Sequence, residues 1–172
     1  MLALMVIDVQ QGMFGSEQPH DGEAVVQRIA GLIARARAAR VPIFFVQHDG
    51  GTGDELDRNG QGFAFRSELT PQPGDSVTVK RYCSSFRDTD LDDILKGSRI
   101  DELVICGMQT DYCIDTTVRA ASDRGYRVTV VCDAHTTFDS AILPAQTIIA
   151  HTHHIWNGRF AKLKLASDVR FA

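Results

Sequence analysis

Residues 103–113 read Leu-Val-Ile-Cys-Gly-Met-Gln-Thr-Asp-Tyr-Cys. The first four residues are apolar, as in a buried β-strand, and Gly107 can then take the unusual backbone angles of a sharp turn. Thr110 is a suitable N-cap, and Asp111 places an acidic group in the first turn of a helix. The apolar residues of that helix recur at Ile114, Val118 and Ala121. This stretch therefore predicts a strand, a tight turn and a helix.

Strand-like and helix-like segments alternate along the rest of the chain. The other apolar runs of strand length are 2–7, 41–46, 77–79, 128–132 and a short one at 161–165. Helical spacing of apolar residues is found in 25–36, 91–95 and 141–149. Because the strands are continuously apolar, both faces of the sheet must be covered. The pattern predicts one domain over residues 1–172, a three-layer α/β/α sandwich around a parallel, doubly wound sheet.

Composition narrows the classes of function. The 172 residues include 18 Lys and Arg against 22 Asp and Glu, so the formal net charge is −4. Neither nucleic acid nor a membrane surface is an expected partner of such an acidic chain. The apolar opening, residues 1–7, is too short for a secretion signal or a bilayer span, and we expect a cytoplasmic protein.

The four cysteines form no CxxC pair, which argues against a zinc site or a dithiol redox motif. Cys106 and Cys132 end apolar runs and are expected to be buried core residues. Cys113 instead falls at the third position of its predicted helix. There the free N–H groups and the helix dipole favour a thiolate and can also bind an oxyanion.

Two further polar residues follow predicted strands, where parallel sheets bind their ligands. Asp8 follows the first strand and Lys80 follows the strand 77–79. If both converge on Cys113, the ammonium stabilises negative charge beside the thiol, and Asp8 is a candidate general base. Taken alone, Asp8 could equally cap a turn, Lys80 could be a solvated charge and Cys113 a packed cysteine.

The histidines and the remaining motifs give weaker indications. His48 follows the strand 41–46 and is expected either to contact substrate or to cap a loop. His151 and His154 share a helical face and are better explained as a solvated or capping pair than as metal ligands, and nothing fixes a role for His153. The glycine-rich segment 48–75 is too long for an ordinary connection and is predicted to be a lid or binding loop. Dinucleotide, P-loop and serine-hydrolase motifs are absent.

Taken in order, several segments make the sequence similar to the isochorismatase-like cysteine hydrolases, which include nicotinamidases and N-carbamoyl amidases. The matching segments are Met5-Val-Ile-Asp8-Val-Gln10 with Gly12-Met-Phe14, Val79-Lys80 leading into Ser84-Ser85-Phe86-Arg87-Asp88-Thr89-Asp90-Leu91, and Cys106-Gly107-Met-Gln-Thr110-Asp-Tyr-Cys113. The resemblance implies a six-stranded parallel sheet and an Asp8, Lys80 and Cys113 triad. It also implies a homodimer or homotetramer and a cis peptide bond, which we place at Met108-Gln109.

One departure from that family bears on metals. The nicotinamidases carry an Asp-x-His metal motif after the second strand, whereas this chain has His48-Asp49 followed by Gly50-Gly51-Thr52-Gly53. We therefore expect no metal and no other cofactor. The retained Cys113 favours covalent amide chemistry over the ether cleavage that isochorismatases perform without a thiol.

These observations predict hydrolysis of a small carboxamide through a thioester on Cys113. The backbone N–H groups of Gln109 and Cys113 are expected to form the oxyanion hole. Aromatic residues of the surrounding loops are expected to form an apolar substrate pocket or, alternatively, plain core. These residues are Phe14, Phe63, Phe65, Phe86 and Tyr112, with His48 as a further substrate contact. Two alternatives stay open, an ether hydrolase with Asp8 as the acid and a redox-sensing or ligand-binding protein with Cys83 as the resolving cysteine.

Overall fold

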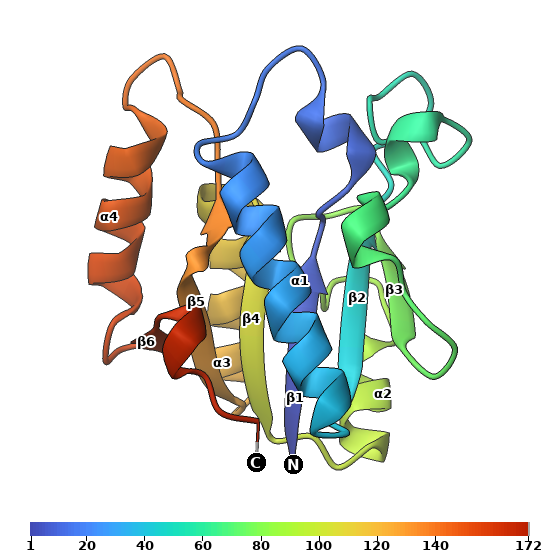
Figure 1. Cartoon of the computed structure of the whole chain (residues 1–172), viewed down its shortest axis with the longest axis vertical. Coiled ribbons are helices and arrows are strands. Elements are labelled where there is room, and N and C mark those ends of the chain that lie inside the picture. The colour runs from blue at the N-terminus through green and yellow to red at the C-terminus, as the bar shows by residue number, and fades with distance from the viewer. Residues whose placement is uncertain (172) are drawn as a thin grey trace.

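Six parallel strands form a single sheet in the computed structural model, which describes residues 1–171 (Figure 1). The strand order is β3-β2-β1-β4-β5-β6, so the chain builds outward from β1 in one direction and then returns to build in the other. The strands are β1 (Leu2–Ile7), β2 (Ile43–His48), β3 (Ser76–Lys80), β4 (Glu102–Met108), β5 (Arg127–Thr136) and β6 (Lys162–Lys164). The predicted doubly wound sheet is confirmed, and its order reverses between the neighbours β1 and β4.

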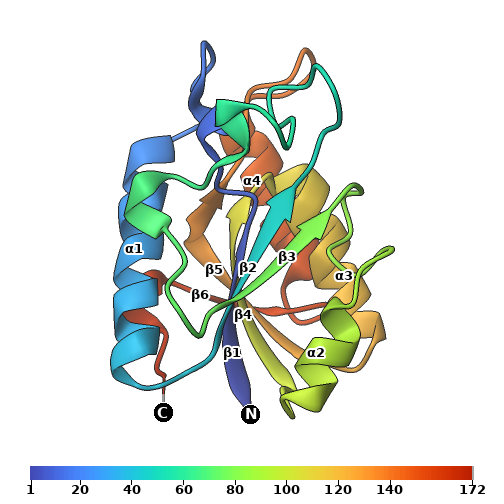
Figure 2. The ribbon, with the colours of Figure 1, turned by 90° about the vertical axis from the view of Figure 1, so that its right-hand side faces the viewer.

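Helices cover both faces of this sheet, as Figure 2 shows edge-on. Helix α1 (Gly22–Ala38) packs on one face against alternate residues of β1, Leu4 and Val6. Helices α2 (Leu91–Gly97), α3 (Asp115–Asp123) and α4 (Ala145–Trp156) lie on the other face. The central strands are apolar on both sides because each side meets a helical layer, which explains the continuous runs in the sequence.

The last helix differs most from its prediction. The apolar spacing placed it at 141–149, whereas α4 spans Ala145–Trp156. Pro144 stands at its N-cap position in an extended conformation, and a carboxylate oxygen of Asp139 accepts the Ala145 N–H at 2.7 Å. Proline cannot donate an N–H but is well tolerated at a helix start, so the helix begins after it.

Strand β5 also runs further than predicted, to Thr136, and its pairing with β4 shifts register between Ile105 and Gly107. Cys106 is buried as expected, but Cys132 is partly exposed within β5, contrary to the core assignment. Within residues 1–171, no helix is both long enough and apolar enough to cross a bilayer.

Candidate active site

Three side chains from separate strands meet at the carboxyl edge of the sheet. Asp8 directly follows β1, Lys80 is the last residue of β3, and Cys113 lies in the helical turn after β4. Strand β2 separates β3 from β1, and its last residue, His48, pairs in register with Lys80. The long Lys80 side chain reaches back past His48 toward the centre of the sheet.

The Lys80 ammonium is the hub of this cluster. Its Nζ lies 2.6 Å from Asp8 Oδ2, 3.2 Å from Cys113 Sγ and 3.3 Å from His48 Nδ1. The Lys80 side chain is fully buried and that of Asp8 is 3% exposed. A buried charge persists only when paired, so the ammonium and the carboxylate stabilise each other here. The second carboxylate oxygen of Asp8, Oδ1, is buried and has no hydrogen-bond partner among the described residues.

Burial and the two charges set the protonation states of the site. Burial raises the pKa of the Cys113 thiol, and the Asp8 carboxylate raises it further, whereas Lys80 opposes both. Burial alone would lower the pKa of Lys80, but the Asp8 carboxylate, with a smaller contribution from Cys113, outweighs burial and raises that pKa. The expected lowering of the cysteine pKa is therefore wrong for the resting site. The raised pKa favours the protonated thiol in the resting site, and the Asp8 carboxylate lies beside that thiol.

The turn that carries Cys113 differs in detail from its prediction. Gln109, not Thr110, is the N-cap, and residues Thr110–Ile114 form a π-helical turn in which the Ile114 N–H donates to Gln109 O at 3.0 Å. Cys113 is thus the fourth helical residue instead of the third. Sequence propensity gives no signal for such a widened turn, a feature frequent at functional sites. The Met108-Gln109 peptide bond is cis, as predicted.

The backbone around this turn has features that suit an oxyanion site. Within residues 1–171, the Gln109 N–H donates to no backbone carbonyl or side-chain acceptor. Asp8 has a φ of 53°, a left-handed conformation that is uncommon for any residue except glycine. Such strain is held where the surrounding structure fixes it, here by the Asp8 N–H donating to Val46 O at 2.9 Å.

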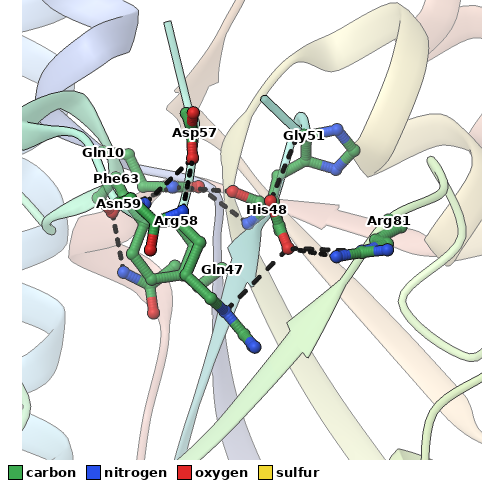
Figure 3. A network of polar contacts seen from close by, with 10 residues as sticks. Gln10, Gln47, His48, Gly51, Asp57, Arg58, Asn59, Phe63 and Arg81 are labelled. Carbon is green, nitrogen blue, oxygen red and sulfur yellow. Dashed lines mark hydrogen bonds and ion pairs between the residues drawn. The ribbon is translucent and has the colours of Figure 1, made fainter. Parts of the chain in front are cut away.

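Gln10 fixes His48 and the long loop beyond it (Figure 3). Its Oε1 accepts the His48 N–H at 2.8 Å, and its Nε2 donates to the carbonyls of His48 and Phe63, both at 2.9 Å. Gln47 Nε2 donates to the same Phe63 carbonyl at 2.7 Å. The segment 48–75, predicted to be a lid or binding loop, is therefore tied to the ends of β1 and β2. Sequence analysis assigned no role to Gln10, because its complete burial is visible only in the structure.

Asp49 occupies the place where a metal ligand was sought in the sequence. Its carboxylate is buried, accepts the Gly51 N–H, and pairs with Arg81 at 3.1 Å and Arg58 at 3.9 Å. Burial alone would raise the pKa of Asp49, but the Gly51 N–H and the guanidinium groups hold it below its usual range. Its charge is already neutralised by these protein groups.

One group of potential metal ligands exists within the described residues, formed by Asp8, His48 and Cys113. One ligand atom from each lies within 4.8 Å of the others. The Lys80 ammonium, however, contacts all three and supplies the positive charge that a metal would bring. This arrangement does not fit a cation bound in addition to Lys80.

A small hollow of about 200 Å³ opens onto these groups. Its wall consists of Asp8, Met13, His48, Leu56, Cys83, Gln109, Tyr112 and Cys113. His48 and Tyr112 thus lie where substrate contact was predicted. Phe86 does not, because it is buried in the core and stacks on Tyr126 with ring centres 6.0 Å apart.

The other predicted aromatic contacts also lie elsewhere. Phe14 packs under Arg66, whose guanidinium lies 4.4 Å from the ring centre, and Phe65 packs edge-on against Phe45. Phe63 contributes its backbone carbonyl to the Gln10 network and not its ring to the hollow. The apolar wall is instead provided by Met13 and Leu56, which sequence analysis did not single out.

A pair of histidines lies beside the turn that carries Cys113. His135 is buried, its Nδ1 lies 2.8 Å from Thr110 Oγ1, and its Nε2 lies 2.7 Å from Nε2 of His153. Burial, and to a smaller extent His153, lowers the pKa of His135 to about 3. His151 and His154, the pair considered in the sequence, are both exposed.

Fold and site together define a parallel α/β protein in which a buried lysine contacts both an aspartate and a cysteine at the carboxyl edge of the sheet. The family model described as "Isochorismatase domain" matches residues 2–148. The uncharacterised isochorismatase family protein YddQ of Bacillus subtilis is 34% identical over 94% of both chains. This chain belongs to the isochorismatase family.

Two further relatives extend the comparison. A streptothricin hydrolase of Streptomyces noursei is 34% identical over 87% of this chain and 54% of its own length. The crystal structure of an isochorismatase from Pseudomonas putida KT2440 is 31% identical and superposes with a TM-score of 0.94, covering 98% of this chain and 90% of that one. The predicted fold and family are thereby confirmed.

Proposed function

We propose that this protein is a cysteine-dependent amidohydrolase that cleaves the C–N bond of a small carboxamide through a thioester on Cys113. The observation that carries the proposal is the Lys80 ammonium, which contacts both Asp8 and Cys113 beside a hollow of substrate size. The similarity to streptothricin hydrolase, an enzyme named for hydrolysis, supports it. No metal or organic cofactor is part of the mechanism.

In the first half-reaction, an Asp8 carboxylate oxygen removes the proton from Cys113, and Sγ attacks the carbonyl carbon of the amide. The negative charge moves to the carbonyl oxygen, which accepts hydrogen bonds from the N–H groups of Gln109 and Cys113. Asp8 then gives its proton to the nitrogen. The C–N bond breaks, ammonia or an amine leaves, and the acyl group stays on Sγ as a thioester.

In the second half-reaction, Asp8 removes a proton from a water molecule that attacks the thioester carbonyl. The same two N–H groups donate hydrogen bonds to the carbonyl oxygen while it carries the negative charge, and the C–S bond then breaks. The proton returns from Asp8 to Sγ, so the carboxylic acid leaves and the site is restored. Lys80 stays positively charged throughout. Its ammonium stabilises the negative charge on Asp8 or on Cys113, whichever of the two is ionised at that step.

The decisive experiment combines ammonia release with intact-mass analysis after rapid quenching. A panel of small amides should give ammonia and a covalent adduct of acyl mass that maps to Cys113. Cys113→Ala should lose more than about 10³-fold in kcat, whereas Cys132→Ser, at a partly exposed site in β5, should keep full activity. Ether cleavage that survives Cys113→Ala would replace this proposal with an isochorismatase-type reaction.

One observation favours a second candidate function, the sensing of peroxide. Cys83 lines the same hollow as Cys113, and a sulfenic acid formed on Cys113 by peroxide could condense with the Cys83 thiol to a disulfide, releasing water. Peptide mapping after peroxide treatment tests this. A Cys83–Cys113 disulfide in a protein that hydrolyses no amide would favour the sensor.

A further inference from the structure

A second, larger hollow adjoins the one that contains the nucleophile. It measures about 490 Å³ and shares Met13, Gln109 and Tyr112 with the smaller hollow. Most of the rest of its wall comes from two loops, the one after β1 and the one before α4, and the remainder is Glu55 from the segment 48–75 and Asp111 from the turn after β4. Both loops rise above the carboxyl edge of the sheet at the top of Figure 1. A substrate whose amide lies at Cys113 can therefore extend into this space.

Every charged residue in the wall of the larger hollow is acidic. These residues are Glu17, Glu55, Asp111 and Asp139. None of the four forms an ion pair with another residue of the described chain. Two are fixed by neutral donors, because Thr137 Oγ1 donates to Asp111 at 2.6 Å and the Ala145 N–H donates to Asp139 at 2.7 Å. The hollow therefore carries uncompensated negative charge beside the nucleophile.

This charge is local to one side of the site. A third hollow of about 330 Å³, near Asp49, is lined by Lys80, Arg81 and Arg58 as well as by acids. The acidic character of the larger hollow is thus not simply the average surface of a chain with net charge −4.

The smaller hollow contains an independent sign of the ligand. Asp8 is one of the residues that line this hollow. Its Oδ2 accepts a hydrogen bond from Lys80, whereas its Oδ1 is buried and has no hydrogen-bond donor among the described residues. A buried acceptor left without a protein donor is matched by a ligand that brings an N–H group. The two hollows together thus favour a ligand that is rich in N–H donors and positively charged.

We propose that the substrate is a carboxamide that also carries a cationic group, an ammonium or a guanidinium, which lies in the acidic hollow while the amide lies at Cys113. That the substrate is an amide rests on the proposed function, and that it carries a positive charge rests on the acidic hollow. Negative charge that lines a concave site concentrates cationic ligands and speeds their arrival. An anionic amide of the same size is rejected for the same reason.

The charge preference can be measured without turnover. Cys113 is labelled with two methanethiosulfonates of similar size, one with a trimethylammonium group and one with a sulfonate, and rates are followed by peptide mass mapping. Relative to free cysteine, the cationic reagent should be favoured at least about tenfold at low salt. The Glu17→Gln/Glu55→Gln variant should reduce this preference several-fold.

The matched control is Asp93→Asn/Asp123→Asn. It changes the net charge equally at two exposed helix positions, in α2 and at the end of α3. This control should keep the wild-type preference. An equal preference in all three proteins, or an equal loss in both double variants, would overturn the inference.

Measurements of turnover then distinguish the proposed charge preference from the proposed amidase activity. Ammonia release is compared for 6-aminohexanamide, hexanamide and the monoamide of adipic acid, which differ mainly in terminal charge. We expect kcat/KM to fall in that order, with the Glu17→Gln/Glu55→Gln variant losing most on the cationic amide. Equal kcat/KM for all three would refute the charge preference while leaving the amidase intact. Absence of hydrolysis with an intact labelling preference would refute the amidase and leave the acidic hollow as a site for cations.

Discussion

The α-carbon of Gly107 lies directly against the backbone of Ile7. A Cβ at position 107 would lie 2.1 Å from Ile7 O and 2.7 Å from Ile7 N, and Gly107 has a φ of 127°. Ile7 precedes Asp8, and Gly107 begins the turn that leads to Cys113. The two strands that lead to Asp8 and Cys113 therefore approach closely at these residues.

Gly107→Ala is expected to destabilise the protein strongly. The added methyl group would meet backbone that cannot move aside, and the residue would need a conformation that alanine avoids, so we expect a loss of about 3 kcal/mol or more. Urea unfolding measures it. The control is Gly31→Ala, an exposed position in α1 with nothing within 4 Å of the new Cβ, which should gain about 0.5–1 kcal/mol. Equal stability of the two variants would contradict this account of Gly107.

Asp8→Asn should abolish turnover and yet speed the alkylation of Cys113. The Asp8 charge raises the pKa of the thiol and Lys80 lowers it, so removing the carboxylate increases the thiolate fraction. Initial rates of iodoacetamide labelling at pH 7.5, mapped by mass spectrometry, provide the measurement, with Cys83 and Cys132 as internal references. Slower labelling of Cys113 in this variant would show that Asp8 does not control the thiol.

Lys80→Met should lower kcat by about 10²-fold to 10³-fold, because the lost ammonium faces negative charge on Asp8 or Cys113 in every step. It should also lower the free energy of unfolding by about 3–5 kcal/mol, since it leaves a buried carboxylate unpaired. Steady-state kinetics and urea unfolding test both. Lys96→Met, on the exposed face of α2, is the control and should change neither. An unchanged kcat in Lys80→Met would remove Lys80 from the mechanism.

Stability should fall as the pH drops below 6.5, in part because of His135. Its pKa is about 3 in the folded protein and about 6.5 in the unfolded chain, so between these values the unfolded state binds more protons. Between these two pKa values, this one group gives the free energy of unfolding a slope of about 1.4 kcal/mol per pH unit. The stability that it contributes is complete at neutral pH and is lost as the pH falls. Unfolding free energies between pH 5 and 7 should show a shallower slope in His135→Asn than in the wild type. Identical slopes in the two proteins would show that groups other than His135 cause the loss of stability at low pH.

Activity should survive chelators. Lys80 already contacts the three groups that could ligate a metal, and Asp49 is neutralised by arginines. Elemental analysis of the active protein, before and after treatment with EDTA and phenanthroline, measures both metal content and rate. A stoichiometric transition metal whose removal abolishes activity would refute the metal-free mechanism.

The alternation of apolar strands and helices was enough to predict the sandwich, because a continuously apolar strand has only one stable environment. The same reasoning predicted that Asp8, Lys80 and Cys113 lie at one edge of the sheet. The details that failed depend on tertiary contacts. The π-helical turn before Cys113 has no propensity signal, and the direction of the Phe86 ring is decided by its packing against Tyr126. The cysteine pKa depends on burial, which the position in a helix alone does not give.

The path of the chain has a consequence for how the site is assembled during folding. Asp8 and Lys80 are 72 positions apart, and β3, which carries Lys80, is an edge strand that joins the sheet only through β2. The ammonium therefore reaches its partners only after β1, β2 and β3 have paired in the correct register. A species that lacks this outer strand has an acid and a thiol but no cation between them. The complete cluster thus requires the N-terminal half of the sheet, and detachment of β3 alone would separate the Lys80 ammonium from Asp8 and Cys113.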